Sequence, residues 1–263
     1  MRNVEGYPLA ECGEPMLSLP EAARAAGVEI VFSDLRTARG CKRIFRLREG
    51  LLPAFLAAAR AMNRRGWVMK VEDAYRTRLI QKHLSRRKRI FDTILRKVTW
   101  ENEGRLPSAA HMLRRTSVLV AMRPKTGTHM SGSAIDLSVL HRGGASEVDR
   151  GGPYLTLSER TPMDSPFISS AARRNRRAIT GLMAEHGFVA YPFEFWHYSA
   201  GDAYAEMLAG AGRPGRYGPV DMDPRSGRVT PMRTPLRRLN NESEFKAEIA
   251  RALRRAEGFS GNR

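Results

Sequence analysis

The spacing of apolar residues along the chain predicts three main helices. Over residues 78–98 the apolar positions recur at helical spacing, which places them on one helical face. The predicted helices are residues 51–65, 78–98 and 171–186. Gly66 and Gly187 follow the first and the third, and glycine is the usual residue at a left-handed helix end. The basic run at 86–89 lies mostly outside the apolar stripe, so it is most simply a solvated face.

Shorter apolar runs predict the strands, and segments rich in Gly, Pro and Ser predict the loops between them. The predicted strands are residues 67–74, 118–121, 134–140 and 188–198. Residues 99–114 indicate a surface excursion, and residues 141–168 indicate a long loop. Loops of this length in compact domains are often functional.

The two ends of the chain differ from its middle. Residues 1–20 predict an irregular arm, and residues 211–235 predict an extended linker. A capping-box pattern at Asn241 then begins a helix that we expect to close at Gly258. We therefore expect a main domain over residues 1–220 and a basic C-terminal extension over 221–263. The regular apolar side of its helix favours packing on the domain over a free appendage for a partner.

Composition and charge limit the kind of protein further. The chain has 263 residues and two cysteines, Cys12 and Cys41, so a zinc site built from several cysteines is excluded. No apolar run is long enough to span a membrane or to act as a secretory signal, which favours a cytoplasmic protein, or a cell-wall or extracellular one exported by another route. The net charge of +18 favours anionic polymers such as nucleic acid or wall polymer, although a solvated arginine-rich surface is the simpler explanation. The oligomeric state is not indicated.

Four residues in two separate stretches carry the inventory of a metal site. His129 and Asp136 lie in Thr-Gly-Thr-His-Met-Ser-Gly-Ser-Ala-Ile-Asp-Leu, and Glu194 and His197 lie in Glu-Phe-Trp-His. A catalytic zinc site needs three nitrogen or oxygen ligands, an open position for water and a base that does not bind the metal. Small residues between His129 and Asp136 allow the chain to reverse, so both side chains can reach one ion.

Glu194 and a further residue, Arg76, are candidates for the chemistry. Glu194 and His197 are three positions apart, so in an ideal strand they point to opposite faces, and we expect a bulge or turn at Phe195-Trp196. Glu194 is then the candidate base, or otherwise a solvated carboxylate. Arg76 is a candidate cation for an oxyanion or a carboxylate, or otherwise a surface arginine. The other histidines have no comparable neighbours and are expected to be structural or exposed; they are His83, His111, His141 and His186.

Three motifs resemble the zinc D,D-peptidases, the family that includes the D-Ala-D-Ala dipeptidases of vancomycin resistance. The motifs are His-x-x-Gly-x-Ala-x-Asp from His129 to Asp136, Glu-x-Trp-His from Glu194 to His197, and Asp-x-Tyr-Arg from Asp73 to Arg76. Their order and separation also match, over roughly residues 45–200. The resemblance implies the hedgehog/DD-peptidase fold, an α+β fold with a small, mostly antiparallel sheet flanked by helices.

The resemblance also implies a site and an activity. One Zn²⁺ per chain is held by His129, Asp136 and His197; Glu194 is the base for attack by metal-activated water, and Arg76 stabilises the transition state. The substrate is D-Ala-D-Ala, as the free dipeptide, with a D,D-carboxypeptidase or endopeptidase acting on peptidoglycan stem peptides as the alternative. Lower in rank are an L,D-type or cross-bridge endopeptidase and a binding module for anionic polymer. Residues expected to contact substrate are Tyr75, Thr128, Asp164 and Trp196.

Two departures from the family pattern bear on the substrate. Gly127 stands where the family usually has serine, two residues before the first histidine. Ile168 stands where the dipeptidases have an acid for the free amino group of the substrate, and Asp164 or Glu159 is expected to replace it. Loss of this acid favours longer, acylated substrates.

Overall fold

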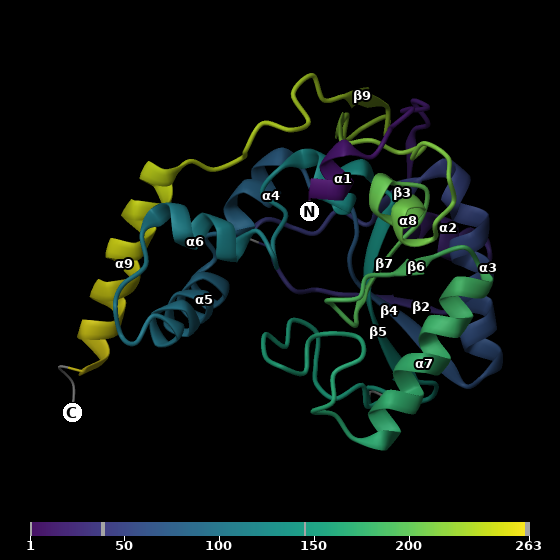
Figure 1. The fold of residues 1–263 in the computed structure, drawn as a ribbon. Helices are drawn as coiled ribbons and strands as arrows, with labels where there is room; N and C mark the ends of the chain where they lie inside the picture. Colours follow the sequence, from purple (N-terminus) through teal and green to yellow (C-terminus); the bar gives the residue numbers. More distant parts are fainter. Residues whose placement is uncertain (1, 38–39, 145, 261–263) are drawn as a thin grey trace.

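The centre of the structure, a computed structural model, is a five-stranded sheet with the strand order β2-β4-β5-β7-β6 (Figure 1). The structure describes residues 2–37, 40–144 and 146–260. The sheet strands are β2 Ile30–Phe32, β4 Trp67–Asp73, β5 Ala134–His141, β6 Val189–Ala190 and β7 His197–Ser199. Only β2 and β4 pair in parallel, and the other neighbours are antiparallel. The prediction of an α+β protein with a small, mostly antiparallel sheet is therefore confirmed.

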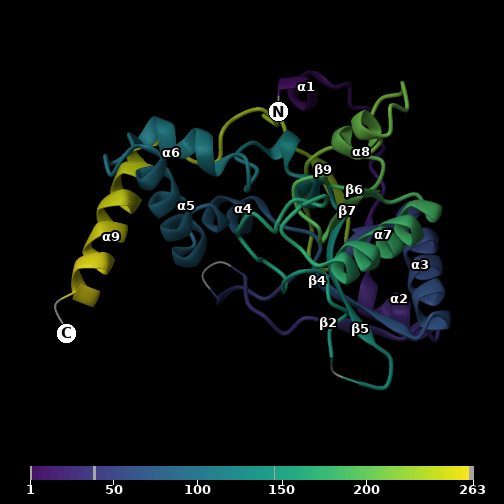
Figure 2. The same ribbon diagram turned by 60° about the horizontal axis from the view of Figure 1, so that its bottom comes forward.

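Some of the helices cover one face of this sheet, and others lie apart from it. Two pairs of short strands also lie outside the sheet. The helices in chain order are α1 Arg2–Gly6, α2 Leu19–Ala25, α3 Leu52–Arg64, α4 Arg78–Leu84, α5 Lys88–Glu101, α6 Ala109–Thr116, α7 Ser170–Glu185, α8 Ala203–Leu208 and α9 Glu242–Ser260. The strands β1 Met16–Ser18 and β3 Arg46–Arg48 pair with each other, as do β8 Val220–Met222 and β9 Val229–Pro231. Figure 2 shows α3 and α7 together on one side of the sheet.

Alternation along β5 separates the apolar core from the polar face of the sheet. Ile135, Leu137 and Val139 belong to the core, which Phe55 of α3 and Leu182 of α7 complete. Successive side chains on a strand point to opposite faces. Asp136 is therefore carried on the face away from α3 and α7, which is where the candidate site forms.

A second apolar cluster lies apart from the sheet, between α5, α6 and α9. The ring of Phe245 on α9 meets the ring of Phe91 on α5 edge-on, at 5.4 Å between centroids. The predicted capping box is present, because Asn241 accepts from the Glu244 amide and Glu244 accepts from the Asn241 amide. The C-terminal helix thus packs on the protein, as the sequence favoured, while the domain boundary after residue 220 stays a prediction.

The helix expected over residues 78–98 is divided, and this expectation was wrong. The break falls at Ser85, whose buried hydroxyl donates to the carbonyl of Lys82 and lies 3.0 Å from the side-chain amide of Asn240. Arg87 then adopts an extended conformation before α5 begins. The two shorter helices can take different directions, so α5 packs against α6 and α9.

The neighbouring expectations also need correction. The excursion expected over residues 99–114 contains most of α6, because Ser108 caps that helix and its apolar side completes the cluster with α5. Residues 118–121 form no strand, because the amides of Val118 and Leu119 bond to carbonyls three residues earlier, as in turns.

Three further segments are more ordered than their composition suggested. The arm over residues 1–20 contains α1 and β1, because residues 16–18 find a partner strand in β3. The linker over residues 211–235 contains the β8–β9 hairpin, whose turn is closed by amides that donate to the Asp223 carboxylate. The last helix does not close at Gly258 but continues to Ser260.

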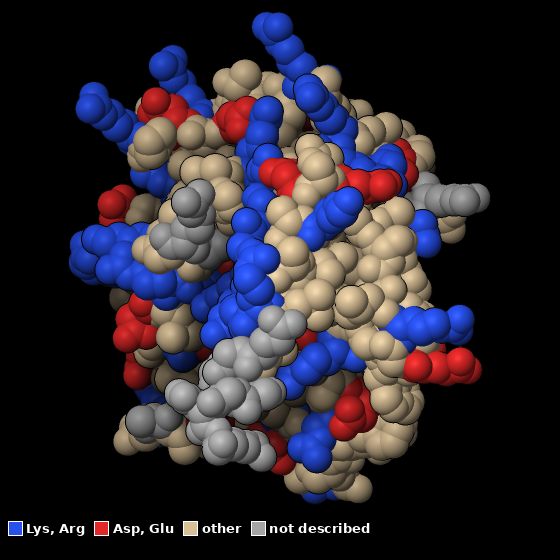
Figure 3. Space-filling model, turned by 90° about the vertical axis from the view of Figure 1, so that its left-hand side faces the viewer, with Lys and Arg blue, Asp and Glu red and all other residues tan. Residues whose placement is uncertain are grey.

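Basic side chains gather over the helices of the second cluster (Figure 3). Residues 82–115 hold ten Lys or Arg and three Asp or Glu, a balance of 10 − 3 = +7 within the total of +18. Several are paired on the surface, such as Lys82 with Glu244 and Arg115 with Glu101. Association with an anionic polymer stays a prediction. No helix in the described part of the chain is long and apolar enough to cross a membrane.

The packing of α9 can be tested by removing its main anchor. Phe245→Ala should lower the free energy of unfolding by about 3–5 kcal/mol, because it removes a fully buried ring and leaves a cavity. Urea unfolding followed by circular dichroism measures this. Trp100→Ala on α5 is the matched control, since its ring is 79% exposed. Equal, small effects of both changes would show that α9 is not packed in solution.

Candidate metal centre

Three adjacent strands carry the polar residues of the site to one place on the sheet. In the antiparallel register Asp136 of β5 lies opposite His197 of β7 and opposite Asp73 of β4. The β4–β5 register shifts between Val71 and Asp73, which brings Asp73 level with Asp136. The sheet therefore places Asp73, Asp136 and His197 beside one another, although they are far apart in the sequence.

His129 reaches the same point from a short 3-10 helix, η4 (Thr128–Ser131), just before β5. Gly132 ends η4 in the left-handed conformation, with φ +68°, and a Cβ there would lie 2.3 Å from the Met16 side chain. Glycine satisfies both restrictions. The tight reversal that the sequence predicted between His129 and Asp136 is thus present.

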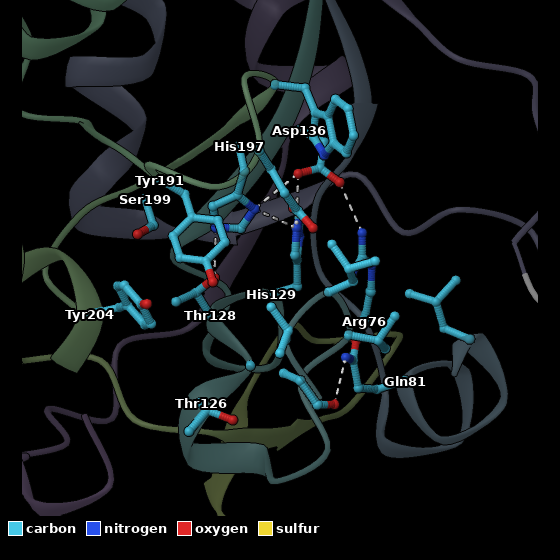
Figure 4. A pocket seen from close by; sticks show the side chains of 18 of the residues that line it. Arg76, Gln81, Thr126, Thr128, His129, Asp136, Tyr191, His197, Ser199 and Tyr204 are labelled. Carbon is cyan, nitrogen blue, oxygen red and sulfur yellow. Dashed lines mark hydrogen bonds and ion pairs between the residues drawn. The ribbon is translucent and has the colours of Figure 1, made fainter. Parts of the chain in front are cut away.

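The ligand atoms of the three predicted metal residues converge. Asp136 Oδ1 lies 3.1 Å from His129 Nε2 and 3.0 Å from His197 Nδ1, and the two nitrogens are 3.1 Å apart. All three side chains are buried. Figure 4 shows them pointing toward one another. For nitrogen and oxygen ligands at about 2.0–2.2 Å in a tetrahedron, neighbouring ligand atoms lie about 3.3 Å apart. The residues present therefore fit a tetrahedral divalent ion.

The outer nitrogen of each imidazole has its own partner. His129 Nδ1 lies 2.5 Å from the carbonyl oxygen of Ala74, which requires the proton on Nδ1 and leaves Nε2 free to bind a metal. His197 Nε2 lies 2.9 Å from the Thr128 hydroxyl. Such contacts fix the orientation and tautomer of metal-binding histidines. Thr128, expected at the substrate, contacts His197 and also lines the cavity beside it.

Arg76 joins the carboxylates of the site. Its Nε donates to Asp73 and its Nη2 to Asp136, at 2.8 and 2.9 Å. Burial disfavours a charged Asp136, but His129, His197 and Arg76 hold the pKa of this carboxyl well below its usual value. Burial also opposes the charge of Arg76, while Asp73 and Asp136 raise the pKa of its guanidinium. A fixed positive charge therefore stands beside the metal residues.

The predicted irregularity before His197 is confirmed. The amide of His197 donates to the Glu194 carbonyl, as in a turn, so β7 begins only at His197 and the strand expected over residues 188–198 is interrupted. Glu194 lines the same cavity as His129, Asp136 and His197. Burial raises the pKa of its carboxyl to about 7, although His197 and a hydrogen bond from Trp196 favour the charged form.

A cavity opens next to these residues, and most of its far wall is apolar (Figure 4). That wall comes from α4, α5, the segment after α6 and two leucines of the long loop; its residues are Leu84, Ile90, Val118, Leu119, Val120, Leu155 and Leu157. Among the described residues that line the cavity, Asp136 and Glu194 are the carboxylates. Gln81 is also there: its amide nitrogen donates to the Ala121 carbonyl, and its buried Oε1 accepts no hydrogen bond.

Some expected substrate contacts lie elsewhere. Tyr75 is buried against Met16 and Val220, and its hydroxyl donates to the Val220 carbonyl, so it does not line the cavity. Asp164 and Glu159, expected to replace the missing acid, are exposed and lie outside the cavity lining. Trp196 does line the cavity. The other four histidines, His83, His111, His141 and His186, do not.

The expectation that residue 168 faces the substrate also needs correction. Ile168 packs against Gly151 rather than facing the cavity, and the loop residues that face it are Leu155 and Leu157. Leu155 has φ +62°, a conformation that a leucine rarely adopts. The sequence pattern gave no signal for Leu155, Gln81 or Tyr154, because leucines, glutamine and tyrosine in such segments are usually structural.

The chain as a whole matches a family of peptidases. A family model described as "D-ala-D-ala dipeptidase" (Peptidase M15) matches residues 49–210, more than half of the chain. The chain therefore belongs to this family, which confirms the resemblance seen in its motifs.

Individual relatives match over a shorter stretch. The D-alanyl-D-alanine dipeptidase of Enterococcus faecalis is 35% identical over 71 residues, which cover 27% of this chain and 35% of that protein. The Escherichia coli D-alanyl-D-alanine dipeptidase is 33% identical over 80 residues, covering 30% and 41%. The chain thus matches between a third and a half of the length of these relatives.

Two solved structures resemble the chain more distantly. The vancomycin resistance D,D-pentapeptidase VanY, solved as a mutant with Zn(II), is 17% identical with a TM-score of 0.38, over 78% of this chain and 94% of that one. The LD-carboxypeptidase LdcB is 16% identical with a TM-score of 0.39, over 79% of both chains. Neither bears on the function proposed below.

The raised pKa of Glu194 predicts a pH-dependent stability in the metal-free protein. Between pH 4.5 and about 7 this carboxyl ionises in the unfolded chain but stays protonated in the folded one. The folded state therefore loses up to about 3 kcal/mol across that window and does not regain it above pH 7. Glu194→Gln removes this loss. Metal-free Glu194→Gln should be more stable than wild type above pH 7 and not below pH 4.5, as measured by urea unfolding. A difference that is constant with pH would show that Glu194 titrates normally.

Proposed function

We propose that the protein is a zinc-dependent peptidase that hydrolyses a D-Ala-D-Ala peptide bond. One Zn²⁺ per chain would be held by His129 Nε2, Asp136 Oδ1 and His197 Nδ1. The convergence of these three buried atoms at tetrahedral spacing is the observation that carries the proposal. When bound, the ion would polarise the scissile carbonyl and make water acidic enough to attack at neutral pH.

The chain's own residues supply the remaining chemistry. Glu194 lines the cavity without belonging to the ligand set, so its carboxylate takes the proton of the attacking water and passes it to the leaving amine. Arg76 lies within hydrogen-bond distance of Asp136 and lines the same cavity, so its guanidinium can neutralise the oxyanion.

The cavity wall favours an acylated substrate over the free dipeptide. A free ammonium group would need a carboxylate beside it, and the two that line the cavity are assigned to the metal and to proton transfer. Leu155 and Leu157 instead offer an apolar surface. We therefore place D,D-carboxypeptidase action on a stem peptide ahead of dipeptidase action.

Glu194→Gln tests the proton-transfer role. The variant should keep its zinc and lose at least about a hundredfold in kcat on a stem peptide ending in D-Ala-D-Ala, because a positioned base contributes roughly 10²–10⁴ in rate. Bound zinc is measured by atomic absorption and alanine release by chromatography. Chelator should abolish release by wild type. Normal turnover by Glu194→Gln, or release that resists the chelator, would contradict the mechanism.

Leu155→Asp tests the choice of substrate. An acid at this position should raise kcat/KM for free D-Ala-D-Ala relative to its N-acetyl form by about tenfold, which corresponds to about 1.4 kcal/mol. Asp also tolerates the left-handed backbone at this residue better than Leu does. Leu155→Asn is the matched control, since it has nearly the same shape without the charge. If the ratio of kcat/KM for the free dipeptide to that for its N-acetyl form is the same in the Asp and Asn variants, Leu155 does not contact the substrate.

A further inference from the structure

The two oxygens of the Asp136 carboxylate have separate sets of partners. Oδ1 faces His129 Nε2 and His197 Nδ1, at 3.1 and 3.0 Å. Oδ2 accepts a hydrogen bond from Arg76 Nη2 and another from the Tyr154 hydroxyl, both at 2.9 Å. With Oδ2 held by two donors, only Oδ1 is turned toward the imidazoles.

Tyr154 reaches Asp136 from the long loop between β5 and α7, and several contacts fix its ring. The ring meets Trp196 edge-on, with centroids 5.6 Å apart, and the Arg43 guanidinium lies over it, 5.6 Å from the centroid. Arg43 is itself held by an ion pair with Asp73 at 2.8 Å. Tyr154 is thus part of the network that surrounds the metal residues and not a mobile loop side chain.

The backbone around Tyr154 is constrained to allow this placement. Gly151 has φ +85°, and a Cβ there would lie 2.4 Å from Ile168. Leu155, the next residue after Tyr154, has φ +62°. Such conformations cost about 1–3 kcal/mol for a non-glycine residue and tend to occur at functional sites.

We propose that Tyr154 is a positioning residue for the metal centre: its hydroxyl holds Asp136 Oδ2 so that Oδ1 alone is presented with the two histidine nitrogens. The inference rests on the proposed function, because it assumes that these atoms bind zinc. Arg76 alone would not suffice for this role. Its charge is shared with Asp73 and is needed for the substrate, whereas the Tyr154 hydroxyl has no other acceptor among its printed contacts with the described residues.

Zinc affinity tests this role independently of turnover. Tyr154→Phe keeps the ring and removes the hydroxyl, so the dissociation constant for zinc should rise by about 10–100-fold, as is typical when the partner of a metal ligand is lost. Competition with a chromophoric chelator measures the constant. Excess zinc should restore most of kcat, because a positioning residue takes no part in the chemistry.

Tyr217→Phe is the matched control. The Tyr217 hydroxyl also donates to a partly buried carboxylate, that of Glu14, at 2.9 Å. Tyr217 lies outside the cavity lining. This variant should bind zinc as tightly as wild type. Thermal unfolding of both metal-free variants shows whether either is damaged as a whole.

The outcomes separate this inference from the proposed function. Unchanged zinc affinity in a folded Tyr154→Phe, or equal losses in Tyr154→Phe and Tyr217→Phe, would overturn the role of Tyr154 alone. Wild-type protein that binds no zinc after reconstitution would overturn the proposed function itself. A Tyr154→Phe variant whose kcat stays low at saturating zinc would show that the hydroxyl acts in the chemistry and does not merely position Asp136.

Discussion

The candidate centre depends on one buried carboxylate, that of Asp136. A charge in this position is strongly disfavoured unless hydrogen bonds and opposite charges surround it. Two imidazoles face one oxygen of Asp136, and Arg76 and Tyr154 donate to the other. These four partners come from four different parts of the chain. A single electrostatic requirement therefore ties η4, the end of β4, β5, β7 and the long loop together, and a divalent cation bound there would meet part of the same requirement.

The two sides of β5 explain how a small sheet can support both a core and a polar site. Ile135, Leu137 and Val139 pack with α3 and α7, so the strand is fixed from its apolar side. Asp136 lies between Ile135 and Leu137 on this fixed strand, and its side chain points to the opposite face, so its position is fixed as well. The wall opposite the metal residues is built separately: segment 117–121 lines the cavity, and the C-terminal part bonds to the chain around it through Leu239 with Met122 and Pro235 with Lys125. The segment beyond the family match thus supports this wall of the cavity.

The sequence predicts what local chemistry dictates and misses what distant partners decide. His129, Asp136, His197 and Glu194 are recognisable because few residue types can bind a metal or move a proton, and the structure brings them to one cavity. The apolar patterns of β4, β5 and α3 are likewise local. The break at Ser85 is not, because its partner Asn240 lies 155 positions away. Tyr154 shows the same limit: a tyrosine in a Gly-Pro loop has no distinguishing pattern until the sheet places Asp136 Oδ2 beside it.

The loop that carries Tyr154 connects the candidate metal centre to the wall of the cavity. Tyr154 contacts the carboxylate, and Leu155, directly after it, lines the cavity. Leu155 is in the left-handed conformation, which turns the chain at this residue. Tyr154 can therefore point to Asp136 while the side chain of Leu155 points into the cavity. Any change that relaxes this backbone moves both side chains. A change of the backbone here therefore affects both the cavity wall and the hydrogen bond to Asp136, whereas a change of the Leu155 side chain alone affects only the wall.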